Sequence, residues 1–250
     1  MNYVMVIETS DYLHRLEANQ FSIFTQKLHN GIANVLKKYE GIIFTSNNNT
    51  YIIHFNSVTN AILCALKIQN NFKYITPKFD KSIRRLKIGI DQNKNDNYSL
   101  AINMCEIVNG EIIISTDVKN HYQSENKNSF INNEHIKVLK HKDEEFLTNT
   151  ISIIEANWNK PNFNIGEFRK KIGLSKSQFY RKLKSITSKS PNQFIKEYRL
   201  QKALKLLHNK KGNISEIAIN TGFNSLAYFS KCFKSKFGIL PSKYIQQHLF

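Results

Sequence analysis

NIGEFRKKIGLSKSQFYRKLKSITSKSPNQFI (residues 164–195) and NISEIAINTGFNSLAYFSKCFKSKFGILPSKYI (residues 213–245) are two copies of one pattern. Four shared residues lie 49 positions apart, and four further ones lie 50 positions apart. The offset changes just after the shared glycine, Gly173 or Gly222, where a short turn can absorb an inserted residue without disturbing the helices around it. The repeat unit is therefore predicted to be helix, glycine turn, helix.

Each copy has the end signals of a helix-turn-helix. In the first copy, Asn164 and Ser175 are positioned to cap two successive helices, and Gly173 to end the first of them. In the second copy, Asn213 takes the capping position and Gly222 turns the chain. Spacing alone would also fit two ordinary helical hairpins in a core, so the interpretation needs a second line of support.

Charge is concentrated in the same part of the chain. Residues 146–250 hold 19 Lys and Arg against four Asp and Glu, whereas residues 1–145 hold 17 against 15, so the formal net charge of +17 is almost wholly C-terminal. Such an excess beside repeated helix-turn-helix units favours neutralisation of phosphates. Anionic lipid would also attract a basic face, but the outer faces carry too few large apolar residues for a membrane anchor. The predicted partner is double-stranded DNA.

A long helix is predicted between the two copies, from Asn192 to Asn209, because its apolar residues recur at helical spacing. At about 1.5 Å per residue such a helix spans on the order of 25 Å. With the flanking units added, the second helix of each copy could enter successive major grooves roughly 34 Å apart on one face of DNA. One chain would then bind DNA as a tethered dimer.

The run LSKSQFYRKLKSITSKSPNQFIKEYRLQKALKLL, followed by ISEIAINTGFNSLAYFSKCFKSKFGILPSKYI, resembles the AraC/XylS-type DNA-binding domain of bacterial transcription regulators. The resemblance covers about residues 148–247. It implies a sequence-specific transcription regulator in which the second helix of each unit reads bases. One departure is Ser188, where that family usually has glycine after the first recognition helix, so the local turn is expected to differ.

The candidate DNA contacts lie on the outer faces of the second helices and at their start. They are Lys176, Ser177, Tyr180, Arg181, Lys184, Ser225, Leu226, Ala227, Tyr228, Ser230, Lys231 and Lys234. The resemblance places Lys184 and Lys234 near phosphates and most of the others at base edges. Leu226 and Ala227 could contact thymine methyl groups, or the second helix could contribute mainly backbone affinity. The first copy is therefore the better candidate for base discrimination.

The N-terminal half alternates short strands with amphipathic helices. Strands are expected at 3–8, 41–45, 51–55, 86–90 and 111–115, with helices between them, in an order that begins β-α-β-β-α-β. That order is typical of a ferredoxin-like sandwich. The predicted fold class is α+β, with a ferredoxin-like domain at 1–118, a polar linker at 119–145 that could hold one short strand, and an all-α DNA-binding domain at 146–250.

This half is also similar to a class III nucleotide cyclase domain, through YEGIIFTSNNNTYIIHFNSVTNAILCALKIQNNF, LKIGID and AINMCEIVNGEIIIST. Such cyclases hold two metal ions with two aspartates. Glu8 and Asn49 stand at those positions, and a neutral amide cannot replace a bridging carboxylate. Asn103 matches the family's asparagine, but the position of its arginine falls on Ile107. The resemblance therefore implies a cyclase-like fold with no catalytic residues, and an unrelated ferredoxin-like module is the alternative.

Cyclase-type domains pair face to face around a nucleotide groove. The resemblance therefore implies a homodimer, a sensor of a small-molecule or protein effector, or both. No convergent set of charged ligands is evident, which favours dimerisation over nucleotide sensing. Two other functions stay open: an active nucleotide cyclase fused to a DNA-binding domain, and a non-specific architectural DNA binder.

Other chemistry has little support in the sequence. Cys64, Cys105 and Cys232 are too scattered for a metal framework and are expected to be reduced, as in a cytoplasmic protein. The eight histidines form no metal-binding pattern, and no apolar run reaches the length of a membrane span. The sequence therefore predicts a cytoplasmic protein with no metal, no cofactor and no membrane partner.

Overall fold

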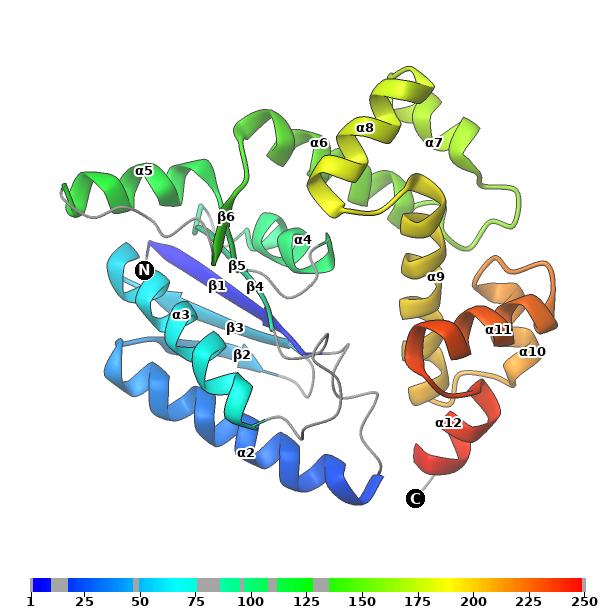
Figure 1. Cartoon of the computed structure of the whole chain (residues 1–250), viewed down its shortest axis with the longest axis horizontal. Helices are drawn as coiled ribbons and strands as arrows, with labels where there is room; N and C mark the ends of the chain where they lie inside the picture. The colour runs from blue at the N-terminus through cyan, green and yellow to red at the C-terminus, as the bar shows by residue number, and fades with distance from the viewer. Residues whose placement is uncertain are drawn as a thin grey trace. The chain divides into compact units, whose positions relative to one another are not determined.

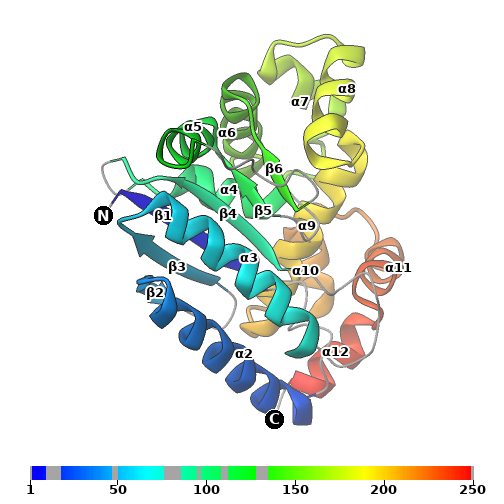
Figure 2. The same cartoon turned by 60° about the vertical axis from the view of Figure 1, so that its left-hand side comes forward.

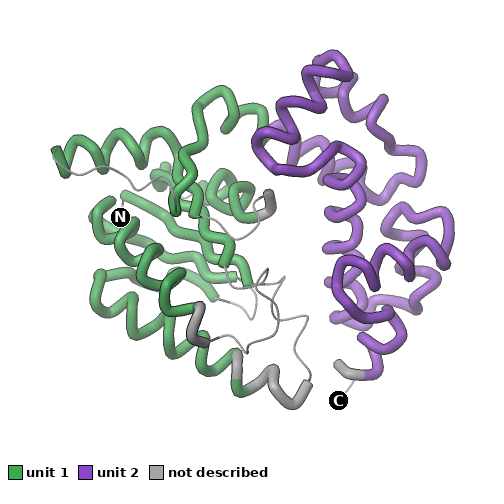
Figure 3. Tube along the Cα trace, viewed as in Figure 1, with its two compact units in different colours: residues 1–148 green, residues 149–250 purple. Residues whose placement is uncertain are grey.

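The computed structural model describes residues 2–9, 18–46, 50–75, 86–94, 97–107, 112–127 and 135–248. The chain divides into two compact units, residues 1–148 and 149–250 (Figure 3). The first unit is a sheet covered by helices, and the described part of the second unit is helical (Figure 1). The mixed fold class agrees with the prediction.

The first unit is built on a six-stranded sheet in the order β2-β3-β1-β4-β5-β6. Its strands are β1 (Tyr3–Glu8), β2 (Ile42–Ser46), β3 (Thr50–Phe55), β4 (Lys87–Gln92), β5 (Ile112–Ile114) and β6 (Ile136–Val138). β1 pairs antiparallel with both β3 and β4, and β2 pairs antiparallel with β3. β5 and β6 extend the sheet in parallel from β4. The strands expected in this half lie within two residues of the predicted bounds.

Helices cover both faces of this sheet (Figures 1 and 2). Met5 and Ile7 of β1 enter a large core shared with α2 (Ala18–Lys38), α3 (Val58–Ile75) and α5 (Thr116–Glu125). Val4 and Val6 point the other way and pack with Ala101 of α4 (Ser99–Ile107). Because both faces of β1 are buried, its sequence is a continuous apolar run with no alternation.

The segment expected to link the domains contributes to the first unit. Residues 119–125 belong to α5, which places Val118 and Tyr122 in the core, and Ile136 of β6 is buried as well. The spacing of Val118 and Tyr122, one helical turn apart, is the apolar stripe of an amphipathic helix whose other side is polar. The border between the compact units therefore lies within α6 (His141–Glu155), at residue 148, and the polar composition marks a solvent-facing surface.

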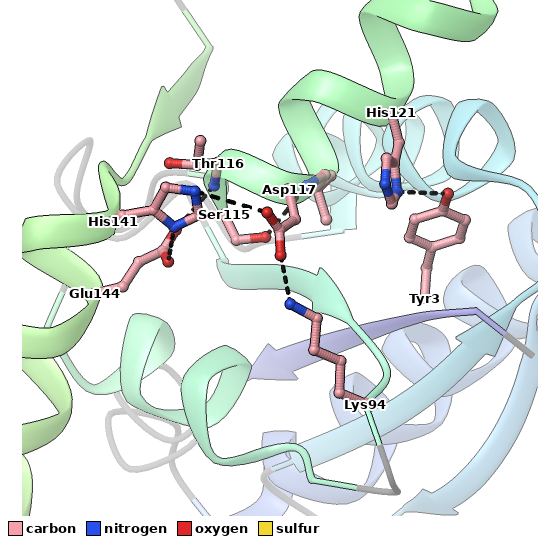
Figure 4. A network of polar contacts seen from close by, with 9 residues as sticks. Tyr3, Lys94, Ser115, Thr116, Asp117, His121, His141 and Glu144 are labelled. Atoms are coloured by element: carbon pink, nitrogen blue, oxygen red, sulfur yellow. Dashed lines mark hydrogen bonds and ion pairs between the residues drawn. The ribbon is translucent and has the colours of Figure 1, made fainter.

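A polar network holds the beginning of α6 against the beginning of α5 (Figure 4). The backbone N–H of Thr116 donates to Glu144 Oε1 at 2.8 Å, and His141 Nδ1 lies 3.0 Å from Glu144 Oε2. Lys94 Nζ forms an ion pair with Asp117 Oδ2 at 2.6 Å, and this hydrogen bond lowers the pKa of Asp117. The network satisfies backbone donors at the start of α5 and keeps α6 attached to the sheet unit.

The second unit is arranged around one long helix. That helix is α9 (Pro191–His208). It is preceded by α7 (Ile165–Ile172) and α8 (Lys176–Thr187), and it is followed by α10 (Ile214–Asn220), α11 (Leu226–Phe237) and α12 (Pro241–His248). α7 and α8 lie at one end of α9, whereas α10, α11 and α12 lie at its other end (Figures 1 and 2). The predicted linker helix is therefore present with the expected length, and it begins and ends one residue earlier than expected.

Candidate nucleic-acid interface

The first helix-turn-helix has the predicted caps. Asn164 Oδ1 accepts hydrogen bonds from the backbone N–H groups of Gly166 at 2.8 Å and Glu167 at 3.2 Å. Ser175 and Gln178 form a capping box at the start of α8. α7 ends at a glycine with φ 77°, a left-handed conformation that favours that residue type. Both helices of the first copy therefore begin where the sequence predicts, and α7 ends at the predicted glycine. Ser188, where the turn was expected to differ, has φ 58° and keeps the left-handed conformation.

The second copy repeats this construction. Asn213 and Glu216 form a reciprocal capping box at 2.9 Å in both directions, and Ser225 Oγ accepts from the Tyr228 N–H at 3.3 Å. Gly222, with φ 81°, lies in the turn between α10 and α11. Two equivalent helix-turn-helix units are therefore present.

The two second helices, α8 and α11, are each buried on one side. Phe179 and Leu183 of α8 and Phe229 and Phe233 of α11 are fully or almost fully buried. The ring of Phe179 lies 4.9 Å from that of Phe168 on α7, centroid to centroid. Burying a side chain of this size is worth about 2 to 3 kcal/mol, so these contacts fix the orientation of each helix.

The predicted contact residues lie on the opposite sides of these helices. All of them are exposed except Ser230, which is half-buried. At 3.6 residues per turn, Ser177, Arg181 and Lys184 share one face of α8, and Ala227, Lys231 and Lys234 share one face of α11. Each helix therefore presents one exposed face, and on α11 that face includes the apolar side chains of Leu226 and Ala227. Whether these side chains contact DNA stays a prediction.

The sequence interpretation missed a charged contact in the middle of α9. Glu197 Oε2 forms ion pairs with Lys189 at 2.8 Å and Lys236 at 2.9 Å. Burial alone would raise the pKa of Glu197, but the two ammonium groups outweigh it and hold that pKa below its usual range. Lys189 follows α8 and Lys236 lies in the last turn of α11, so one carboxylate joins both copies. The only available signal was an acidic residue in a strongly basic half.

A second contact on α9 was also missed. The guanidinium of Arg199 donates from Nε to the Trp158 carbonyl at 2.7 Å, and from Nη2 to the carbonyls of Lys160 at 2.7 Å and Phe163 at 3.3 Å. These carbonyls belong to the turn that precedes α7. A Cβ at Gly222 would lie 2.8 Å from Arg199 Nε. Arg199 therefore holds the entry to the first copy beside the turn of the second.

The N-terminal positions singled out by the cyclase resemblance are only partly placed. Glu8, at the end of β1, accepts a hydrogen bond from Thr50 Oγ1 at 3.2 Å across the β1–β3 pairing. Asn49 lies outside the described residues. Asn103 is buried on α4, and Ile107 is the last residue of that helix.

Metal and membrane chemistry are not evident in the described ranges. No group of three or more His, Cys, Asp or Glu side chains there could hold a metal ion. Burial raises the pKa of the Cys64 thiol to about 12, so that side chain stays a neutral, apolar core residue. None of the helices in these ranges combines the length and apolar character that crossing a bilayer requires.

Comparisons with known proteins include a family match that lies within the second unit. Residues 169–247 match the protein-family model described as "Helix-turn-helix domain". Over 122 residues, 47% of this chain and 9% of the relative, the chain is 38% identical to "Histidine kinase P4" of Formosa agariphila. It is 29% identical to the "Msm operon regulatory protein" of Streptococcus mutans over 44% of this chain and 39% of that protein. It thus spans well under half of either relative's length.

Further similarities are to regulators and to a solved structure. The "HTH-type transcriptional regulator MtrA" of Neisseria gonorrhoeae is 33% identical over 33% of this chain and 27% of that protein. A transcriptional regulator structure from Chromobacterium violaceum, whose description includes "AraC-type DNA-binding domain-containing proteins", is 27% identical with a TM-score of 0.39, over 43% of this chain and 95% of that one. The family match confirms the predicted helix-turn-helix for residues 169–247, and this part of the chain is similar to proteins described as transcription regulators.

Proposed function

We propose that this chain is a sequence-specific, DNA-binding transcription regulator that reads two successive major grooves with α8 and α11. The observation that carries the proposal is that each of these helices buries a face with aromatic side chains and presents the face of the candidate contacts to solvent. Arg181 and Ser177 on α8 are side chains of the type that reads base edges. The excess of 19 basic over four acidic residues in 146–250 would supply the backbone affinity.

Selection and competition test this proposal. The purified chain is incubated with fragments of the native genome, and the bound fragments are sequenced. We expect a preferred site with two half-sites about one helical turn apart, displaced by random DNA only at concentrations at least about 1,000-fold higher. Equal displacement by random DNA would leave the alternative of a non-specific architectural binder.

We propose for the first unit a ferredoxin-like, cyclase-like domain that dimerises and has no catalytic activity. The strand order β2-β3-β1-β4 with antiparallel neighbours supports the ferredoxin-like arrangement. Exposed apolar side chains on the edge strand β2 support dimerisation, since Ile42 is 53% exposed and Phe44 is 61% exposed. Sedimentation of the chain and of Phe44→Ser tests this, and a monomeric wild-type chain at micromolar concentration would contradict it.

The absence of cyclase activity has its own test. Glu8 and Asn49 stand in place of the two aspartates that would hold two metal ions. Incubation with ATP or GTP and Mn²⁺ should therefore yield no cyclic nucleotide. Production of cyclic nucleotide that is lost in Glu8→Ala would establish the fused-cyclase alternative. As a DNA-binding regulator the chain would act in the cytoplasm.

A further inference from the structure

A cleft of about 540 Å³ lies between the two helix-turn-helix units. Its walls are the turn at 161–164 before α7, the first half of α9, and the turn at 222–225 with Tyr228 of α11. Ser225 and Tyr228, both candidate DNA contacts, therefore line it. The cleft thus opens beside the start of the second recognition helix.

The lining is basic and rich in amides. Lys196 and Arg199 contribute two cations, Asn192 and Asn224 contribute side-chain amides, and no Asp or Glu lines the cleft. Across the ranges that the structure describes, Lys196 has neither a hydrogen bond nor an ion-pair partner. Positive charge in a concave, carboxylate-free surface favours an anion over an apolar ligand.

The donors of Arg199 are only partly used. Nε and Nη2 bind the three carbonyls of the turn before α7, and a guanidinium carries five N–H groups. The two on Nη1 have no acceptor within the described part of the chain. Arg199 therefore has a structural role and still offers donors at the cleft wall.

The geometry of DNA indicates which anion would lie between the two helix-turn-helix units. Two successive major grooves on one face of a duplex are separated by a minor groove and the two sugar-phosphate backbones that border it. A protein that places α8 and α11 in those grooves must present the surface between them to these backbones. The cleft lies between the two helix-turn-helix units and is lined by Ser225 and Tyr228 at the start of α11, so it is the candidate for that surface.

We propose that the sugar-phosphate backbone between the two half-sites enters this cleft, with Lys196 neutralising a phosphate and Asn192 and Asn224 donating to its neighbours. This inference rests on the proposed function. It adds to the predicted interface three residues that lie outside the two recognition helices. A phosphate contact of this kind fixes register on the duplex and carries no base preference.

The salt dependence of binding tests the proposal, with a control on the same helix. Lys205 is exposed and lies nine positions from Lys196, about two and a half helical turns, on the opposite side of α9. Lys196→Ala should weaken binding to the selected fragment and to random duplex by the same factor and reduce the salt slope by about one. Lys205→Ala should leave both unchanged, and thermal unfolding of each variant checks the fold.

Ethylation interference gives an independent readout. Ethylating individual phosphates between the two half-sites should impair binding by the wild-type chain and have less effect on Lys196→Ala. Equal slopes for the two lysine variants, or no interfering phosphate between the half-sites, would overturn the cleft assignment while leaving the proposed function intact. Binding without sequence preference would overturn the proposed function, and the slope comparison would still decide the cleft. No binding to any DNA would overturn both.

Discussion

The two helix-turn-helix copies have the same caps but different surroundings at their glycine turns. Gly173 and Gly222 both have positive φ, 77° and 81°. A Cβ at Gly173 would meet nothing within 4 Å, whereas one at Gly222 would lie 2.8 Å from Arg199 and 2.9 Å from the Trp158 carbonyl. The local signal for the turn is therefore the same in both copies, but only the second turn is part of the packing between them.

The largest expected effect separates these two glycines. Gly222→Ala should lower the free energy of unfolding by about 3 kcal/mol, because it adds left-handed strain and displaces the Arg199 guanidinium from the carbonyls of the turn before α7. Gly173→Ala should cost only the strain, about 1 to 2 kcal/mol. Urea unfolding of the two variants measures the difference. Equal losses would mean that the Arg199 contact contributes nothing to the stability of the second unit.

A second comparison concerns what each copy contributes to DNA binding. Arg181→Ala, on the first recognition helix, should weaken binding to the preferred site by about 1 to 3 kcal/mol and relax preference at one base pair. Lys234→Ala, on the second, should weaken binding to all sequences alike and reduce the salt slope by about one. Titrations against the selected fragment and single-base variants of it measure both. If neither substitution changed affinity for the preferred site, the assignment of α8 and α11 would be wrong.

The ion pairs of Glu197 test how far the two copies depend on each other. Glu197→Gln should lower the free energy of unfolding at pH 7 by about 1 to 3 kcal/mol, since the carboxylate is largely buried and bonded to two lysines. Its folded pKa lies below the unfolded value of about 4.3, so its contribution is complete above that pH and is lost as the pH falls through the folded pKa.

Wild type and Glu197→Gln should therefore converge in stability as the pH falls below about 4. Urea unfolding at pH 7 and at pH 3 measures this, with Glu167→Gln, an exposed carboxylate on α7, as the control. A difference that persisted unchanged at pH 3 would indicate loss of packing, with no contribution from charge.

The sequence predicted most of what depends on local signals. The caps at Asn164, Ser175 and Asn213 are encoded by residues within one helical turn, and the strands of the first unit by their apolar runs. The Glu197–Lys236 and Arg199–Trp158 contacts join residues about 40 positions apart, so no spacing rule reveals them. The polar segment at 119–145 was expected to be a linker for a related reason. Its few apolar residues pack on the sheet and the helices of the first unit, and these contacts are not visible in the local sequence.

The smallest expected effect concerns the residue that ends each recognition helix. Ser188 and Gly238 lie 50 positions apart, and both are left-handed, with φ 58° and φ 79°. The serine therefore keeps the turn that glycine makes in the other copy and accepts the strain that a Cβ causes there. Ser188→Gly should change the free energy of unfolding by less than about 1 kcal/mol, because relief of strain is offset by the entropy of a freer unfolded chain. Gly238→Ser, in open space, should cost about 1 kcal/mol. A larger loss at Ser188 than at Gly238 would show that the serine side chain has a stabilising role of its own.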